Sequence, residues 1–238
     1  MNNLQAVILA GGKGTRLKPY TTNFPKPLMP IGDKPILEII IEKLRKSGIN
    51  EIILSTGHLE ELIRAYFGDG KKFGVSLKYY KEEKPLGTAG SLRLFKEEIK
   101  EDFILMNGDV ISDIKFEDLH NVHRSSGNMI TVTLSERKNE IDYGVVETDD
   151  NNRILNWLEK PITKYLVSTG IYLISREALD YLPGMETEYY TFPEWVMAIV
   201  QSGKKASGYI HKGYWLDIGR PEDYEKACID SENYNFFI

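Results

Sequence analysis

Cysteine and histidine are scarce in this chain, which has one cysteine and four histidines among 238 residues. The lone thiol of Cys228 cannot form an intramolecular disulfide, so we expect a reducing compartment. His120 and His123 are three residues apart on a predicted helix. They lack a third nearby ligand, which argues against a zinc site.

Long apolar runs and an excess of positive charge are also absent. No stretch approaches the ~20 apolar residues that a membrane span requires, and no basic segment with an apolar run precedes the first strand, as a signal peptide would. The formal net charge is −5, whereas nucleic-acid binders usually present a basic face. We expect a cytoplasmic protein that binds neither membranes nor nucleic acid.

The first half of the chain alternates predicted strands and helices. Because such a rhythm favours a mostly parallel sheet flanked by helices, we expect a Rossmann-like α/β fold. Ligands of such sheets bind at the carboxyl ends of the strands. The predicted strands are 6–9, 51–56, 75–80 and 103–106, and the predicted helices are 36–47, 60–67 and 88–99, the last capped by Thr88.

The second half reads as a mixed-sheet region within the same single domain, 1–238. It has no linker or repeat, and no hexapeptide pattern of a C-terminal β-helix, so we expect none. The predicted strands are 129–135, 144–148, 154–158, 168–174 and 206–210, and the predicted helices are 116–125, 176–182, 192–202 and 221–231.

The segment after the first strand combines glycines with positive charge. Leu9–Leu17 reads Leu-Ala-Gly-Gly-Lys-Gly-Thr-Arg-Leu, and Pro25–Pro27 follows it. Glycines let the backbone approach a ligand closely, and successive N–H groups can form an anion-binding nest. Arg16, Lys18 and Lys26 add fixed positive charge, so the segment predicts a polyphosphate site.

Two known phosphate-binding loops do not match this segment. The chain contains no G-x-x-x-x-G-K-[ST] string, which excludes a P-loop. A dinucleotide fingerprint needs a third glycine and a helix. Leu17 replaces that glycine, and Pro19, Pro25, Pro27 and Pro30 exclude a continuous helix.

The glycine segment, with Pro25-Lys26-Pro27 after it, resembles the signature of the nucleoside-diphosphate-sugar pyrophosphorylases, the sugar-1-phosphate nucleotidylyltransferases. Further segments resemble motifs of this family, in family order and over more than 200 residues. They are Pro85–Gly90, Asn107–Asp109, Tyr143–Val145, Glu159–Pro161, Ser168–Gly170 and Trp215–Gly219.

The resemblance implies that a sugar 1-phosphate oxygen attacks the α-phosphorus of a nucleoside triphosphate and that pyrophosphate leaves. Such chemistry rests on positioning and charge neutralisation. The implied catalytic residues are Arg16 and Lys26, which contact phosphates, and Asp109 and Asp217, which coordinate one Mg²⁺. The plain alternatives are solvated surface cations, a turn role for Asp109 and a structural hydrogen bond for Asp217.

The resemblance also assigns binding residues. Residues 1–110 would bind mainly nucleotide and 111–238 mainly sugar phosphate. His58 and the aromatics at 189–193 could border the pocket, although core or dimer packing explains the aromatics equally well. The nucleotide set is Leu9, Ala10, Gly11, Gly12, Gly14, Thr15, Arg16, Glu82, Pro85, Gly87, Thr88, Asn107 and Gly108, and the sugar-phosphate set is Gly144, Glu159, Lys160 and Gly170.

Glu82 is the candidate for base recognition. A carboxylate accepts two hydrogen bonds from guanine N1–H and N2–H₂ but suits thymine and uracil poorly. Residues 82–90 also resemble mannose- and heptose-1-phosphate guanylyltransferases, so we favour GTP as the donor. The alternatives are a uridylyl- or cytidylyltransferase acting on another sugar or alcohol phosphate, and a non-catalytic regulatory subunit that binds nucleotide sugar. The sequence leaves the sugar and the oligomeric state open, with a homo-oligomer as one option.

Overall fold

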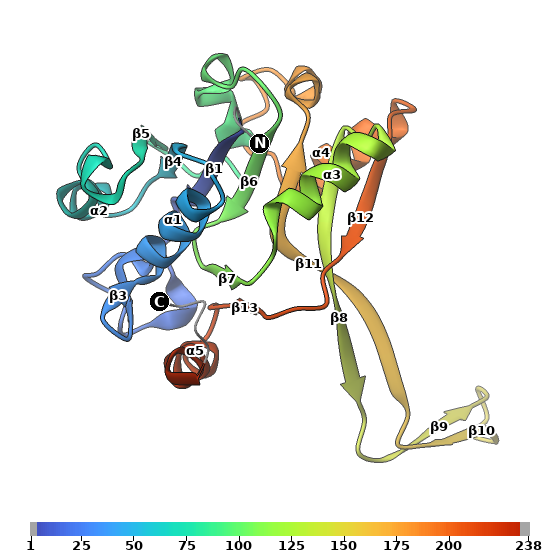
Figure 1. The fold of residues 1–238 in the computed structure, drawn as a ribbon. Coiled ribbons are helices and arrows are strands. Elements are labelled where there is room, and N and C mark those ends of the chain that lie inside the picture. The colour runs from blue at the N-terminus through green and yellow to red at the C-terminus, as the bar shows by residue number, and fades with distance from the viewer. Residues whose placement is uncertain (1–3, 234–238) are drawn as a thin grey trace.

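The computed structural model describes residues 4–233, and a seven-stranded sheet forms its centre (Figure 1). Four strands are parallel, in the spatial order β6, β1, β4, β5. This arrangement confirms the predicted Rossmann-like α/β class. The four strands are β1 (Gln5–Ala10), β4 (Glu51–Thr56), β5 (Ser76–Lys81) and β6 (Phe103–Asn107).

The second half of the chain extends the sheet with mixed directions. Strand β11 (Ile162–Ile174) runs antiparallel to both β6 and β8 (Ile130–Glu140). Strand β12 (Ala206–Ile210) pairs in parallel with β8 at the far edge. Residues 4–233 contain no β-helix, and none of their helices is long and apolar enough to cross a membrane.

Helices cover both faces of the sheet because its central strands are apolar on both sides. In β1, Ala6 and Ile8 pack into one core and Val7 into the other. Helix α1 places a buried stripe from Ile36 to Leu44 on the first face, whereas Trp195 of α4 is fully buried on the second. The helices are α1 (Ile36–Lys46), α2 (Glu60–Phe67), α3 (Phe116–Ser126), α4 (Phe192–Gln201) and α5 (Pro221–Asn233).

The predicted helix 88–99 is wrong, because short 3-10 helices stand in its place at Gly90–Leu94 and Lys96–Glu98. The amides of Ala89 and Gly90 both donate to the Tyr190 carbonyl, which ties this segment to a distant loop. Residues 176–181 are also a 3-10 helix where a helix over 176–182 was predicted.

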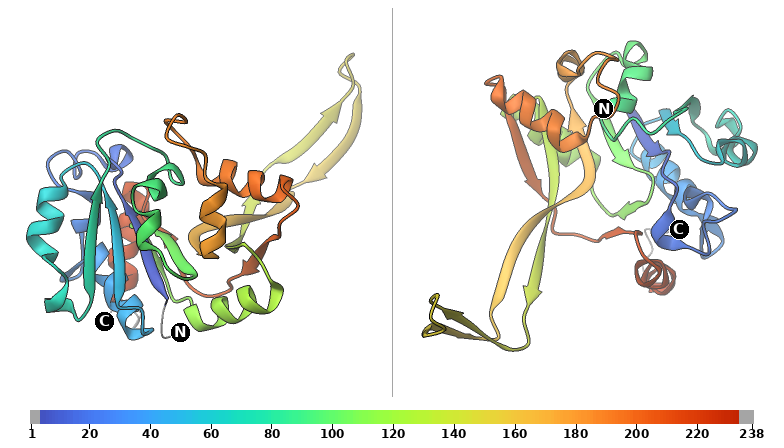
Figure 2. Two further views of the ribbon diagram at one scale, coloured as in Figure 1. Left: turned by 90° about the horizontal axis from the view of Figure 1, so that it is seen from above. Right: turned by 180° about the vertical axis from the view of Figure 1, so that it is seen from behind.

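Strands β8 and β11 are longer than predicted and form an arm, residues 135–167, that projects from the body (Figures 1 and 2). Their pairing continues without interruption from Ser135–Val167 to Glu140–Ile162. The arm ends in a separate hairpin of β9 (Gly144–Thr148) and β10 (Ile154–Glu159).

Two short antiparallel pairs complete the strands. One pairs β7 (Val110–Ser112) with β13 (Trp215–Asp217) and joins the two halves of the chain. The other pairs β2 (Pro30–Ile31) with β3 (Lys34–Pro35) before helix α1.

Candidate active site

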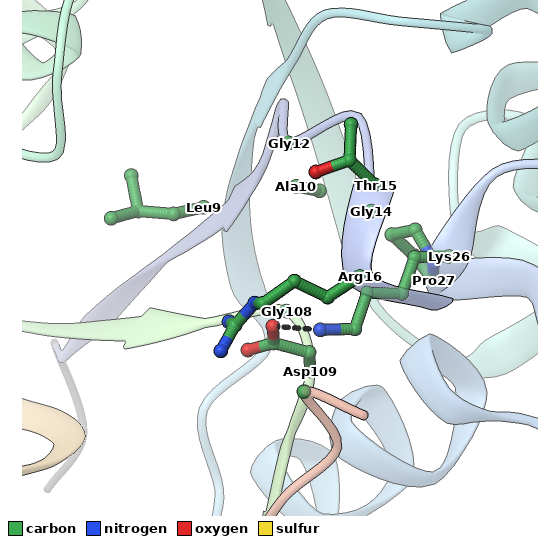
Figure 3. Close-up of a pocket in the computed structure, with 11 residues that line it drawn as sticks. Leu9, Ala10, Gly12, Gly14, Thr15, Arg16, Lys26, Pro27, Gly108 and Asp109 are labelled. Atoms are coloured by element: carbon green, nitrogen blue, oxygen red, sulfur yellow. Dashed lines mark hydrogen bonds and ion pairs between the residues drawn. The ribbon is translucent and has the colours of Figure 1, made fainter. Parts of the chain in front are cut away.

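A cavity of about 260 Å³ lies at the carboxyl ends of β1 and β6, where a parallel sheet presents its ligand-binding edge. The loop after β1 and the short helix of Lys26 close one side, and the turn after β6 closes the other (Figure 3). The lining residues are Leu9, Ala10, Gly12, Gly14, Thr15, Arg16, Lys26, Pro27, Gly108, Asp109 and Gly219.

The glycine loop is anchored at both ends and leaves amide groups unused between them. The Gly108 amide donates to the Leu9 carbonyl at 2.9 Å, and Thr21 Oγ1 donates to the Gly14 carbonyl at 2.6 Å. The amides of Gly12 and Lys13 donate to no carbonyl of residues 4–233. These free N–H groups suit an anion, as the sequence predicted.

The two candidate cations differ in their surroundings. Lys26 is buried, and its Nζ forms an ion pair with Asp109 Oδ2 (Figure 3). Arg16 is exposed, and its guanidinium lies over Gly219, where a Cβ atom would come within 3.3 Å of both terminal nitrogens. Lys26 is therefore held in place, while Arg16 keeps its hydrogen-bond donors available.

The β7–β13 pair brings Asp217 beside Asp109. Asp217 lies opposite Val110, and the Ile218 amide donates to the Asp109 carbonyl at 3.0 Å. Burial and the neighbouring Asp109 carboxylate raise the pKa of Asp217, with Lys26 and Arg16 acting in the opposite direction. Two carboxylates this close repel each other unless a cation lies between them.

The carboxylate pair fits a magnesium ion. Oδ1 of Asp109 and Oδ1 of Asp217 are both buried and accept no hydrogen bond from the described residues. Mg²⁺ prefers oxygen ligands and usually takes one or two carboxylates together with substrate phosphates and waters. Among residues 4–233 no group of three or more His, Cys, Asp or Glu side chains forms a fuller cage. The remaining ligands would therefore come from phosphates and waters.

A second, larger cavity of about 730 Å³ shares Leu9, Gly12 and Asp109 with the first. Glu82 lines it in a fixed orientation, since its carboxylate accepts hydrogen bonds from Ser55 Oγ at 3.0 Å and from the Leu86 amide at 3.1 Å. A carboxylate has about four acceptor positions, so Glu82 retains capacity for a ligand.

Every residue of the predicted nucleotide set lines one of these two cavities. Thr88 acts differently from the expected helix cap, because its Oγ1 accepts a hydrogen bond from the Phe192 amide at the start of α4. His58 and Tyr189 border the larger cavity, as the sequence suggested. The predicted residues that line this larger cavity are Leu9, Gly11, Gly12, Glu82, Pro85, Gly87, Thr88 and Asn107.

Only one of the four predicted sugar-phosphate residues lies at the site. Gly170 packs against Asn107, whose Nδ2 would lie 2.6 Å from an added Cβ. Gly144, Glu159 and Lys160 lie instead on the arm, because the continuous β8–β11 pairing carries them away from the sheet (Figure 1). The binding role of these four residues stays a prediction, and one chain by itself places only Gly170 beside the pocket.

Several lining residues were not singled out from the sequence. Gly219 lies within the recognised segment Trp215–Gly219, so the motif itself could have pointed to it. Ser55 lines neither cavity but orients Glu82, and it carried no such signal, since its role depends on strand β4 lying beside Glu82. The others are Lys13, Pro27, Gly57, Leu59, Glu61, Lys81, Glu83, Lys84 and Ser91.

This fold and this site point to a broad class of proteins. Its members bind phosphates on a glycine loop at the carboxyl ends of parallel strands. Within it, the chain belongs to the nucleotidyl transferase family, whose model matches residues 5–233. The predicted family is confirmed by relatives named as sugar-1-phosphate nucleotidylyltransferases.

Two curated relatives illustrate the range of the family. The chain is 36% identical over 242 residues to a UTP–glucose-1-phosphate uridylyltransferase of Synechocystis sp., covering 94% of this chain and 62% of the relative. It is also 36% identical to a D-glycero-alpha-D-manno-heptose 1-phosphate guanylyltransferase of Campylobacter jejuni, covering 96% of this chain and 100% of the relative. The chain thus spans less than two thirds of the Synechocystis protein but the whole of the Campylobacter one.

A solved structure shares the fold. The crystal structure of HddC from Yersinia pseudotuberculosis has a TM-score of 0.74 and 27% identity, and the match covers 96% of this chain and 99% of that chain.

Proposed function

We propose that this chain transfers a nucleotidyl group from a nucleoside triphosphate to a sugar 1-phosphate, giving a nucleotide sugar and pyrophosphate. The main structural support for this proposal is the pair of buried, unpartnered oxygens on Asp109 and Asp217 beside Lys26 and Arg16. Two neighbouring carboxylates that each keep one unpartnered oxygen, next to cations and free loop amides, suit Mg²⁺ and phosphates together. The names of the relatives support the same reaction type.

The reaction needs no protein nucleophile, because the sugar phosphate oxygen attacks the α-phosphorus and the α–β phosphoanhydride bond breaks. The amides of the glycine loop hold the triphosphate, and Arg16 neutralises the departing pyrophosphate through its fork of donors. Lys26, fixed by Asp109, faces the phosphate at which charge develops. Mg²⁺, when bound by Asp109 and Asp217, would neutralise phosphate charge.

Within this proposal GTP is the favoured donor. Glu82 is held by Ser55 and the Leu86 amide, so its remaining lone pairs face the larger cavity in a fixed direction. Two neighbouring donors, which guanine has and uracil lacks, match such a carboxylate. The name of the Campylobacter relative supports guanine. The name of the Synechocystis relative supports uridylyl transfer as the second candidate.

The two halves of the chain divide the substrates in this proposal. Residues 1–110 hold the nucleotide, and residues 111–238 supply Asp217 and the sugar-phosphate side with Gly170. A reducing, cytoplasmic location agrees with a single cysteine that forms no disulfide.

The test is pyrophosphate release from each of five nucleoside triphosphates with a panel of sugar 1-phosphates and Mg²⁺. We expect release with GTP and at least one sugar 1-phosphate. Nucleotide-sugar binding without pyrophosphate release from any pair would refute catalysis and favour a non-catalytic subunit. Turnover restricted to UTP, or to CTP with an alcohol phosphate, would favour the alternative transferases.

Glu82→Gln tests the assignment of the base. The amide keeps the size of the side chain but replaces one acceptor by a donor, so we expect the preference for GTP over UTP to fall by about 10- to 100-fold. Steady-state kcat/KM for both donors measures this change. Glu97→Gln, at an exposed glutamate that lines neither cavity, is the matched control and should leave the preference unchanged. An unaltered preference in Glu82→Gln removes the argument for guanine.

A further inference from the structure

The arm carries an unusual concentration of exposed apolar side chains. Of the twenty large apolar side chains that are exposed in residues 4–233, ten lie between Ile141 and Leu166. Tyr143 is 78% exposed, Trp157 59% and Tyr165 53%. Contiguous apolar surface of this kind marks an interaction site.

The hairpin at the end of the arm has no core of its own. Strands β9 and β10 pair only with each other, and every residue of β10 is exposed. Trp157 and Leu158 are consecutive in β10, so apolar side chains project from both faces of the hairpin. A two-stranded hairpin is marginally stable in water without a packing partner. Apolar side chains on both faces of a strand are the pattern expected of strands that are covered on both sides.

The root of the arm fixes its direction away from its own body. Thr169 is buried, and its Oγ1 donates to the Thr133 carbonyl at 3.1 Å. Trp215 Nε1 donates to the Thr169 carbonyl at 2.8 Å, and the Arg137 guanidinium lies 4.8 Å from the centre of a Trp215 ring. Folding the arm back over its own pocket would break these contacts. The five residue steps from Ser135 to Glu140 carry the hairpin about 17 Å outward.

The pocket, meanwhile, has too little positive charge for its proposed substrates. The formal charges of Arg16 and Lys26 are cancelled by those of Asp109 and Asp217, so even Mg²⁺ bound by the two aspartates would leave a net charge of only about +2. A sugar phosphate alone adds a charge of about −1.5 to −2. Lys160 lies on the arm at the base of this hairpin, between β10 and β11, and among residues 4–233 its ion-pair partner is the exposed Asp142 at 2.6 Å. An exposed pair of this kind is weak and can be exchanged for a phosphate.

We propose that two copies of this chain exchange arms, so that Lys160 and Glu159 of each copy complete the sugar-phosphate side of the other copy's pocket. The inference rests on the proposed function for the role of these two residues, whereas the exchange itself rests on the apolar surface and the rigid root. A two-fold arrangement lets the same arm and the same body surface serve both copies.

The apolar area is sufficient for a stable dimer. An aromatic side chain buries about 150–250 Å², so covering Tyr143, Trp157 and Tyr165 would bury roughly 400 Å² per arm at their present exposure. Two arms and the surfaces that they cover reach about 1,500 Å², within the range of stable interfaces.

The first test is the molar mass of the full chain by light scattering after size exclusion. We expect a dimer for the wild type and a monomer for Ile154→Asp, which places a charge in the exchanged surface. Ile229→Asp on α5 is the matched control, because both isoleucines are 63% exposed, and it should stay dimeric. Circular dichroism checks that both variants fold. A monomeric wild type, or a dimer that Ile154→Asp leaves intact, overturns the exchange.

The second test is complementation between two inactive variants. Asp217→Asn has an impaired pocket and an intact arm, and Lys160→Ala has the reverse. We expect each alone to lose at least 100-fold in pyrophosphate release. Differently tagged chains, co-expressed, should recover about one quarter of wild-type activity, because half the dimers are mixed and each has one complete site.

The outcomes separate the two proposals. No recovery in mixed dimers would place Lys160 in its own chain's site, and full activity of Lys160→Ala would remove its role, so either result overturns the exchange of site residues. A dimeric wild type that Ile154→Asp dissociates but that turns over no substrate would overturn the proposed function and leave the arm exchange supported.

Discussion

At the scale of single residues, four side chains from distant parts of the chain form the candidate site. Lys26 and Asp109 form a partly buried pair, and Asp217 lies beside them with a raised pKa. Arg16 is the exposed member, held over Gly219. Lys26 is buried and the two aspartates are half-buried, so these three are sensitive to one another's charge, while Arg16 can be altered with little effect on folding.

Arg16→Ala should lower kcat/KM by about 10²- to 10³-fold, because removal of a group that stabilises transition-state charge typically costs this much. Steady-state pyrophosphate release measures the loss. The thermal midpoint without ligand should stay within about 1 °C of the wild type, since exposed substitutions change stability little. Lys71→Ala, at a highly exposed cation far from the pocket, is the control. A loss of less than tenfold would contradict the role of Arg16.

Asp217→Asn should raise the stability of the metal-free protein at pH 7. The folded-state pKa of Asp217 is raised, so its contribution to stability is present below the ordinary carboxyl pKa and is lost as pH rises through the folded value. Asparagine cannot ionise, so the variant does not lose this stability as pH rises. Urea unfolding at pH 4 and pH 7 measures the effect, which should be smaller at pH 4.

The effect of Mg²⁺ on thermal stability tests the same carboxylate as a metal ligand. Mg²⁺ should raise the thermal midpoint of the wild type at pH 7 and have little effect on Asp217→Asn. Asp150→Asn, in an exposed turn, should respond like the wild type. Equal magnesium shifts in all three proteins would show that Asp217 does not hold the ion.

At the scale of elements, contacts between distant segments override local preference. Residues 88–99 have a helix-like pattern but bond to the 184–190 loop: Arg93 donates to the carbonyls of Gly184, Thr187 and Glu188. Helix α4 instead receives two caps, since Thr191 forms a capping box with Glu194 and Thr88 accepts from the Phe192 amide. No periodicity rule could have identified these partners.

Gly87→Ala and Gly203→Ala test the close packing of the Gly87 loop against Tyr190. Both glycines have φ near +80°, so alanine should cost about 1–2 kcal/mol of unfolding free energy at either position. A Cβ at Gly203 meets open space, whereas one at Gly87 meets the Tyr190 carbonyl. Gly87→Ala should therefore cost clearly more in urea unfolding and weaken nucleotide binding. Equal costs would show that the Gly87 loop yields freely.

At the scale of the whole molecule, a protein with net charge −5 places Arg16 and Lys26 at the pocket where the proposed substrates carry negative charge. Strands β7 and β13 link the two halves of the chain at that point. Nucleotide bound there should therefore stabilise the molecule as a whole.

GTP with Mg²⁺ at about 100 times its dissociation constant should add about 2.7 kcal/mol of stability. For a domain of this size that corresponds to a rise of about 5–10 °C in thermal midpoint. Differential scanning fluorimetry measures it, and Arg16→Ala should show a smaller rise at the same concentration. An equal rise with ATP would contradict the selective base pocket.

The sequence by itself determined the parallel half of the sheet and the glycine loop. Strands such as 103–106 are short and apolar, and Gly11–Arg16 carries its chemistry in consecutive residues, so local pattern is enough. Asp109 followed from the same logic, because it comes directly after such a strand. The resemblance of Trp215–Gly219 to a family motif supplied Asp217.

Only the tertiary structure decided which of these groups meet. Asp217 reaches Asp109 through the β7–β13 pairing, and Glu82 is oriented by Ser55 of a neighbouring strand. The uninterrupted β8–β11 pairing separates Glu159 and Lys160 from Gly170, although all three belong to motifs in one stretch of sequence. The reason is physical: strand pairing and side-chain contacts between distant segments set these positions, and no local propensity encodes their partners.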